Sequence, residues 1–153
     1  MSFAPHAVPA RLTVATLGAR DVKTLRDFYA GLGWPVLVDS DDFVAFQTQG
    51  ALLAIFALSE LEADARTKAN APENGLRGFT LAINVGSREE VDSTIAAIHS
   101  HGGRITKQPV DATLFDGRSA YFADPEDNYW EVVYFGGGGE VGDAIRRIIG
   151  VQT

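Results

Sequence analysis

The residue with the clearest capacity for chemistry is Glu131, a carboxylate within an aromatic and apolar run near the end of the chain. In an extended strand, Tyr129, Glu131 and Val133 share one face. A carboxylate on an apolar face needs a hydrogen-bond or charged partner. Glu131 is therefore a candidate general base, a candidate anchor for a ligand, or the counter-charge of an arginine such as Arg118. A purely structural pairing is the remaining alternative.

Residues that bind metals are scarce. The chain has no Cys and three His, namely His6, His99 and His101. The lack of Cys excludes disulfides, a thiolate nucleophile, iron–sulfur clusters and Cys-ligated zinc. His99 and His101 fall two positions apart at the end of an expected helix, where they point to different sides. Neither a Gly-x-Ser-x-Gly elbow nor a phosphate-binding loop is present, and the four glycines at 136–139 indicate a hinge.

Length and charge exclude several classes of protein. A chain of 153 residues, 46% of them hydrophobic, suits one domain or two small halves that share a core. The net charge of −7 and the scattered basic residues argue against nucleic acid or an anionic membrane as a partner. The chain lacks an apolar stretch of about 20 residues and a signal-peptide pattern, so we expect a cytoplasmic protein.

The chain reads as two similar halves, each with the pattern βαβββ. In the first half a strand at 12–17 precedes a helix capped by Asp21, and strands are expected at 34–38, 43–47 and 51–58. In the second half a strand at 79–85 precedes a helix with a capping-box pattern at Ser87 and Glu90. Further strands are expected at 104–106, 112–115, 119–123 and 129–135. Two such halves suggest a duplicated module.

Two segments lie outside these modules. Residues 59–78 contain a short helix, expected from Ser59 to about Ala69, and a turn-rich stretch, and they form either a surface linker or a flap over a ligand. Residues 136–153 combine the glycine hinge with an amphipathic helix. The apolar stripe of that helix must cover either its own sheet or a partner subunit.

Three motifs carry a resemblance to a known family. Residues 16–21 (TLGARD), 28–34 (FYAGLGW) and 121–132 (YFADPEDNYWEV) resemble the vicinal oxygen chelate superfamily, which holds glyoxalase I, bleomycin resistance proteins and extradiol dioxygenases. The resemblance implies an α+β fold in which two tandem βαβββ modules, 1–58 and 79–135, form a curled mixed sheet around a cavity. It also implies a homodimer. The linker 59–78 and the tail 136–153 complete the single domain.

The resemblance also implies where a metal would be bound. In metal-dependent members the ligands come from the first and last strands of each module, and these positions fall on Val14, Ala54, Thr80 and Glu131, with Leu81 as an alternative to Thr80. Only Glu131 can ligate a metal. Because a catalytic divalent ion needs two or three fixed His or carboxylate ligands, we expect no metal cofactor.

The expected cavity is apolar, with few polar anchors. Its predicted lining comprises Val14, Ala54, Phe56, Thr80 and Tyr129, with Tyr121 and Trp34 as neighbours and Glu131 as the one carboxylate. Such a cavity favours a small, largely hydrophobic ligand, bound without the usual metal centre. Two alternatives remain open. One is a glyoxalase I-like lyase or dioxygenase whose Zn, Ni, Mn or Fe ligands are displaced or completed by a dimer partner, and the other is a metal-free isomerase or lyase with Glu131 as base.

Overall fold

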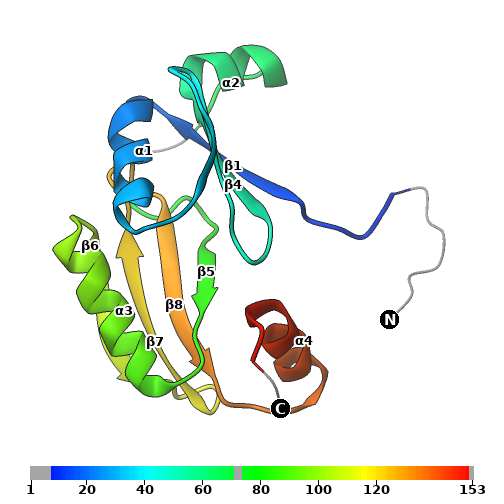
Figure 1. Ribbon diagram of the computed structural model, residues 1–153, viewed down its shortest axis with the longest axis vertical. Helices are drawn as coiled ribbons and strands as arrows, with labels where there is room; N and C mark the ends of the chain where they lie inside the picture. The colour runs from blue at the N-terminus through cyan, green and yellow to red at the C-terminus, as the bar shows by residue number, and fades with distance from the viewer. Residues whose placement is uncertain (1–7, 71–73, 152–153) are drawn as a thin grey trace.

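A computed structural model describes residues 8–70 and 74–151 and contains two four-stranded mixed sheets (Figure 1). Sheet A has the strand order β1-β4-β3-β2, with β1 parallel to β4 and the other pairs antiparallel. Its elements are β1 (Val14–Ala19), α1 (Val22–Gly31), β2 (Val36–Asp39), β3 (Phe43–Phe46), β4 (Leu52–Ala57) and α2 (Leu58–Ala65).

Sheet B repeats this arrangement, with the order β5-β8-β7-β6 and β5 parallel to β8. Its elements are β5 (Leu81–Asn84), α3 (Arg88–Ser100), β6 (Arg104–Asp111), β7 (Gly117–Ala123), β8 (Tyr129–Phe135) and α4 (Gly139–Ile149). The α+β fold with two βαβββ modules is therefore confirmed, and one further helix follows each module. Within the ranges described, no helix is long and apolar enough to cross a bilayer.

Local chemistry sets the starts of the two long helices as expected. The side chain of Asp21 accepts a hydrogen bond from the Thr24 amide at 3.0 Å, and Ser87 Oγ accepts one from the Glu90 amide at 3.2 Å. Each bond satisfies an amide that has no partner inside the helix.

The bounds of one expected helix and the existence of one expected strand were wrong. α2 starts at Leu58 without a side-chain cap and ends at Ala65, because Arg66 has a left-handed backbone with φ of 55°. The strand expected at 112–115 is absent, and β6 instead continues to Asp111, opposite Arg118 of β7. Pairing with β7 determines where β6 ends, so the length of β6 cannot be predicted from its own residues.

Each sheet has a helix face and an open face. α1 and α3 pack on the helix faces, and α4 lies on the other side of sheet B (Figure 1). In β4, Leu53 and Ile55 point into the core under α1, which leaves Leu52, Ala54 and Phe56 on the open face of sheet A. α2 covers one end of that face.

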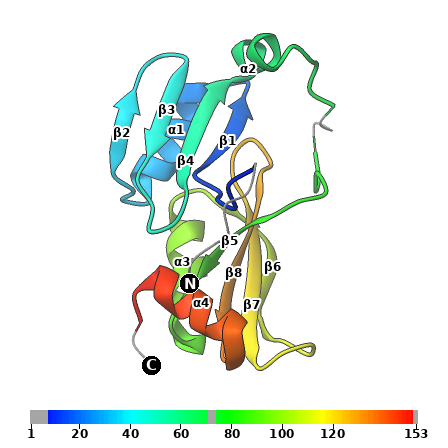
Figure 2. The same cartoon turned by 90° about the vertical axis from the view of Figure 1, so that its right-hand side faces the viewer.

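The two modules are joined by a buried polar cluster that we term the junction network: Tyr29, Asp124, Asn128 and Trp130. The Tyr29 hydroxyl donates to Asp124 Oδ2 at 2.5 Å and accepts from Trp130 Nε1 at 2.9 Å. The Asn128 side-chain amide also donates to Asp124, at 2.9 Å. Figure 1 shows α1 of the first module at the end of sheet B where β8 begins, and Figure 2 shows sheet A above sheet B, with α1 behind sheet A.

The tail packs against the turn between β3 and β4. Gly138 precedes α4, and Arg146 of the helix donates to the Gly137 carbonyl at 3.3 Å. Ile148 lies beside Gly50 in the turn between β3 and β4, yet its side chain stays 58% exposed. α4 thus rests on its own chain with part of its apolar stripe still open to solvent.

Candidate functional site

Three side chains from adjacent strands form a polar row across the open face of sheet B. Lys107 of β6 lies opposite Tyr121 of β7, and Tyr121 lies opposite Glu131 of β8. On the other side of Glu131, the opposite residue in β5 is the apolar Ala82. Because directly opposed residues on one face have neighbouring side chains, the sheet itself brings an ammonium, a phenol and a carboxylate together.

The polar row is connected by direct interactions. The Tyr121 hydroxyl donates to Glu131 Oε2 at 2.9 Å. The Lys107 ammonium lies 5.4 Å from the centroid of the Tyr121 ring and donates to Ser119 Oγ at 2.9 Å. Burial, and then the hydrogen bond to Glu131 and its negative charge, raise the pKa of Tyr121 above its ordinary value. The phenol therefore remains protonated at neutral pH and acts as a donor to the carboxylate.

The arginine suggested as a counter-charge for Glu131 is not its partner. Arg118 lies on the helix face of β7, where its guanidinium bonds Asp92 at 2.9 Å and Asp111 at 3.4 Å. Alternation along β7 places Arg118 and Tyr121 on opposite faces. The hydroxyl of Tyr121, not an arginine, is the hydrogen-bond partner of the Glu131 carboxylate among the described residues.

The candidates from the first module lie on the open face of sheet A. Val14 is 43% exposed, whereas Ala54 is fully buried. Phe56 is half-buried and packs edge-on against Phe43, with ring centroids 5.6 Å apart. This face is apolar at all three positions, so sheet A offers a hydrophobic wall without a polar anchor.

The remaining candidates divide between the open face and the core. Thr80 precedes β5 and is exposed, whereas Leu81, the alternative position, packs on the core side opposite Trp130. Tyr129 lies on the open face of sheet B, beneath the Arg104 guanidinium at 6.0 Å. Trp34 instead packs in the core at the module junction, 5.6 Å from the Trp130 ring.

The donor set at the four family positions does not suit a divalent metal. Val14, Ala54 and Thr80 supply no imidazole or carboxylate, which leaves Glu131 as the one ligand-type residue among them. Among residues 8–70 and 74–151, no three His, Cys, Asp or Glu side chains are grouped closely enough to hold a metal ion. A single carboxylate cannot fix a catalytic divalent ion.

Two residues of the site were missed from the sequence, Lys107 and Ser119. Lys107 lies just beyond the expected end of the strand that became β6, and Ser119 lies near the start of β7. Their contact depends on how these two strands pair. The one local signal is Pro109, which lacks an amide proton and within a strand indicates an edge or a bulge.

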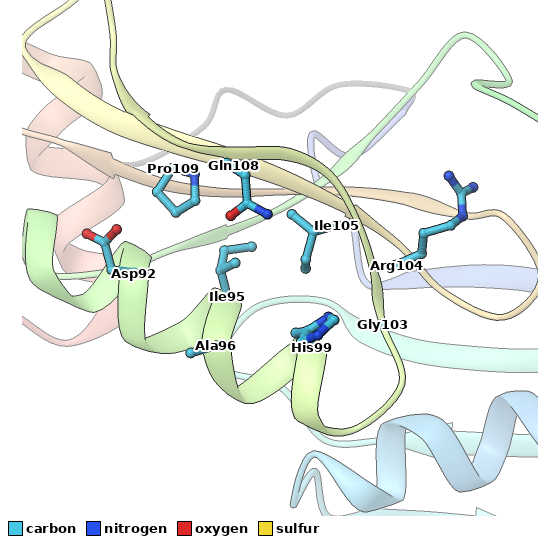
Figure 3. A pocket seen from close by; sticks show the side chains of 9 residues that line it. All are labelled: Asp92, Ile95, Ala96, His99, Gly103, Arg104, Ile105, Gln108 and Pro109. Atoms are coloured by element: carbon cyan, nitrogen blue, oxygen red, sulfur yellow. The ribbon is translucent and has the colours of Figure 1, made fainter.

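A separate groove of about 500 Å³ lies on the helix side of sheet B, between α3 and β6 (Figure 3). Ile95 and Ile105 form part of its apolar lining, and His99 stands at its rim. The Asp92 carboxylate is already bound by Arg118, and the Arg104 guanidinium turns away to Asp127 at 2.8 Å. The groove therefore has few polar groups left for a ligand.

Replacing Glu131 by glutamine is expected to lower the pKa of Tyr121 towards its ordinary value, because the substitution removes the adjacent negative charge. The measurement is tyrosinate absorbance against pH, with each protein compared with its own Tyr121→Phe version to isolate this phenol. Glu89→Gln, on the exposed first turn of α3, should leave the titration unchanged. An unaltered titration in Glu131→Gln would contradict the hydrogen bond.

Comparison with known proteins places this arrangement in a family. The model for the Glyoxalase/Bleomycin resistance protein/Dioxygenase superfamily matches residues 11–132. A glyoxalase-related enzyme from Fulvimarina pelagi is 26% identical, with a TM-score of 0.73 over 82% of this chain and 88% of that chain. A search of curated proteins gives no match.

Two further solved structures share the fold. A glyoxalase/bleomycin resistance protein/dioxygenase from Nocardioides is 23% identical, with a TM-score of 0.74 over 88% of this chain and 89% of that chain. Lactoylglutathione lyase from Agrobacterium tumefaciens is 21% identical, with a TM-score of 0.62 over 82% and 94%. The family match extends from the residues before β1 into β8 and so includes both modules. The chain therefore belongs to the Glyoxalase/Bleomycin resistance protein/Dioxygenase superfamily.

Proposed function

We propose that the chain binds a small, largely hydrophobic molecule on the open face of sheet B, without a metal at the family positions. The observation that carries this proposal is the hydrogen bond of 2.9 Å between the Tyr121 hydroxyl and Glu131 Oε2. It creates an oriented polar anchor on a face that also carries the apolar side chains of Ala82, Ala123 and Val133.

The anchor is suited to a ligand that carries a hydrogen-bond donor. Tyr121 occupies one oxygen of the Glu131 carboxylate, and a carboxylate accepts at both oxygens. Glu131 is half-buried, so a ligand can reach it while hydrogen bonds there are strengthened by partial exclusion of water. The neighbouring Tyr129 ring offers an apolar surface for stacking. Family members that sequester a ligand without chemistry supply the analogy.

The experiment is a binding screen of small aromatic alcohols, phenols and amines by amide chemical shifts. We expect the compounds that bind to perturb β7 and β8, and Glu131→Gln to weaken their binding about tenfold, because one hydrogen bond to a charged group is lost. Tyr121→Phe should weaken binding less, since the carboxylate remains. Glu89→Gln is the matched control, because it removes the same charge from the exposed side of α3.

Three results would change the assignment. Equal affinities in wild type and Glu131→Gln would contradict the anchor. Stoichiometric binding of Zn, Ni, Mn, Fe or Co to wild type, with a raised melting temperature, would contradict the metal-free assignment. Turnover that disappears in Glu131→Gln while binding persists would assign Glu131 the role of a general base.

A further inference from the structure

The edge strand β6 is irregular on both sides of Lys107. Ile105 lies opposite Phe122 and Lys107 lies opposite Tyr121, so two steps along β6 match one step along β7. From Lys107 to Val110, three steps along β6 match the two steps from Tyr121 to Ser119. Each mismatch is one extra residue, which defines a β-bulge.

These bulges decide which face Lys107 occupies. In a regular strand, residues two positions apart share a face. Ile105 packs on the core beneath α3, so a regular β6 would turn Lys107 towards α3 as well. The extra residue between them reverses the alternation and places Lys107 on the open face, opposite Tyr121.

The Lys107 ammonium is held in place but not neutralised. Its one hydrogen-bond partner in the part of the chain that the structure describes is Ser119 Oγ, at 2.9 Å, and Ser119 is buried. None of the ion pairs among the described residues includes Lys107. An ammonium has three donors, so two of them are left for a ligand, and Lys107 is exposed beside the Tyr121 ring.

We propose that Lys107 binds a carboxylate of the ligand whose hydrogen-bond donor is held by Glu131. This inference rests on the proposed function and deepens it, because it identifies the ligand class as a small organic acid with an apolar part and a hydroxyl or ammonium group. Lys107 and Glu131 are two strands apart, about 10 Å between their backbones, and both side chains converge on Tyr121. A molecule a few bonds long spans that distance.

The charges of the row favour a carboxylate over a phosphate. Lys107 and Glu131 carry opposite charges, so the row is neutral as a whole. A monoanionic carboxylate can contact the ammonium with its donor group directed at Glu131. A dianionic phosphate would add repulsion from the Glu131 carboxylate.

The test uses matched acids and amides, namely benzoate with benzamide, 3-phenyllactate with its amide, and phenylalanine with phenylalaninamide. Each is titrated at neutral pH and followed by the amide shifts of β6, β7 and β8. In wild type, the acids should bind about five- to tenfold more tightly than their amides, as expected for one partly exposed ion pair. Lys107→Met should abolish this preference and leave the affinity for the amides unchanged. Lys107→Arg should keep it.

The control is Lys68→Met, which removes the same charge from a lysine that is 90% exposed near Glu62. Equal binding of acids and amides in wild type, or a preference that survives in Lys107→Met, would overturn the role of Lys107 while the proposed function stands. If neither acids nor amides perturb β7 and β8, the proposed binding function itself is overturned.

Discussion

Replacing Asp124 by alanine is expected to lower the free energy of unfolding by about 4 kcal/mol, because several donors in the junction network lose a charged acceptor. The Asp124 side chain is 3% exposed. One carboxylate oxygen accepts from the amides of Glu126 and Asn128 at 3.0 and 2.9 Å. The other accepts from the Tyr29 hydroxyl at 2.5 Å and the Asn128 side chain at 2.9 Å.

Alanine cannot replace any of these bonds, and the site is closed to solvent. Burial, and then the nearby Asp124 charge, raise the pKa of Tyr29 well above its ordinary value. Burial remains in the variant, so the Tyr29 hydroxyl stays protonated and loses its acceptor. Burial also raises the pKa of Asp124, although the hydrogen bonds from Tyr29 and Asn128 act in the opposite direction.

The measurement is urea denaturation at neutral pH, followed by circular dichroism. Tyr29→Phe is the matched control, because it removes one hydroxyl of the same network and keeps the ring. We expect it to cost about 1.5 kcal/mol. A loss of less than about 1 kcal/mol in Asp124→Ala would show that the network contributes little to the junction.

Replacing Trp130 by alanine is expected to cost about 4 kcal/mol, because it removes a large ring from the core where the modules meet. Trp130 is 5% exposed. It stacks on Phe122 with ring planes 5° apart and centroids 6.0 Å apart, and it meets Trp34 edge-on at 5.6 Å. The surrounding rings belong to both modules, so closing the cavity would require side chains of both modules to shift.

Trp130→Phe separates packing from hydrogen bonding, since it keeps an aromatic ring and removes the Nε1 donor to Tyr29. It should cost about 2 kcal/mol. In the double variant Asp124→Ala/Trp130→Ala, the loss of unfolding free energy should be smaller than the sum of the losses in the two single variants. The reason is that both residues bond the Tyr29 hydroxyl. Additive losses in the same urea series would mean that the two contacts are independent.

The parts of the fold that depend on local chemistry were predictable from the sequence. Asp21 and Ser87 cap their helices as expected, and β8 runs from Tyr129 to Phe135, as its aromatic and β-branched run indicated. Alternation in that strand also separated Glu131 from Trp130 and Val132, and these two residues do lie in the core. These features involve residues close together in the chain, so their patterns are visible in a short stretch.

The parts that depend on pairing between distant strands were not predictable. The extent of β6 and the position of Lys107 follow from two bulges against β7, and the composition of β6 does not show them. The hydrogen-bond partner of Glu131 could not be predicted for the same reason. Arg118 and Tyr121 lie on opposite faces of β7, and only the pairing of β7 with β8 shows that Tyr121 is opposite Glu131. The neighbours of Trp34 were likewise hidden, because its ring packs against Trp130, which belongs to the other module, as well as against Tyr29, which is close in the chain.

The junction network also has a consequence for how the chain is made. Sheet A is complete within Val14–Ala57, so the first module can form its ladders before the second leaves the ribosome. Tyr29, however, is separated from Asp124 by 95 residues. Until those residues emerge, the nascent first module displays its Tyr29 hydroxyl and the surrounding aromatic surface to the cell. We therefore expect the interval between translation of the two modules to be the period in which this aromatic surface is open to aggregation.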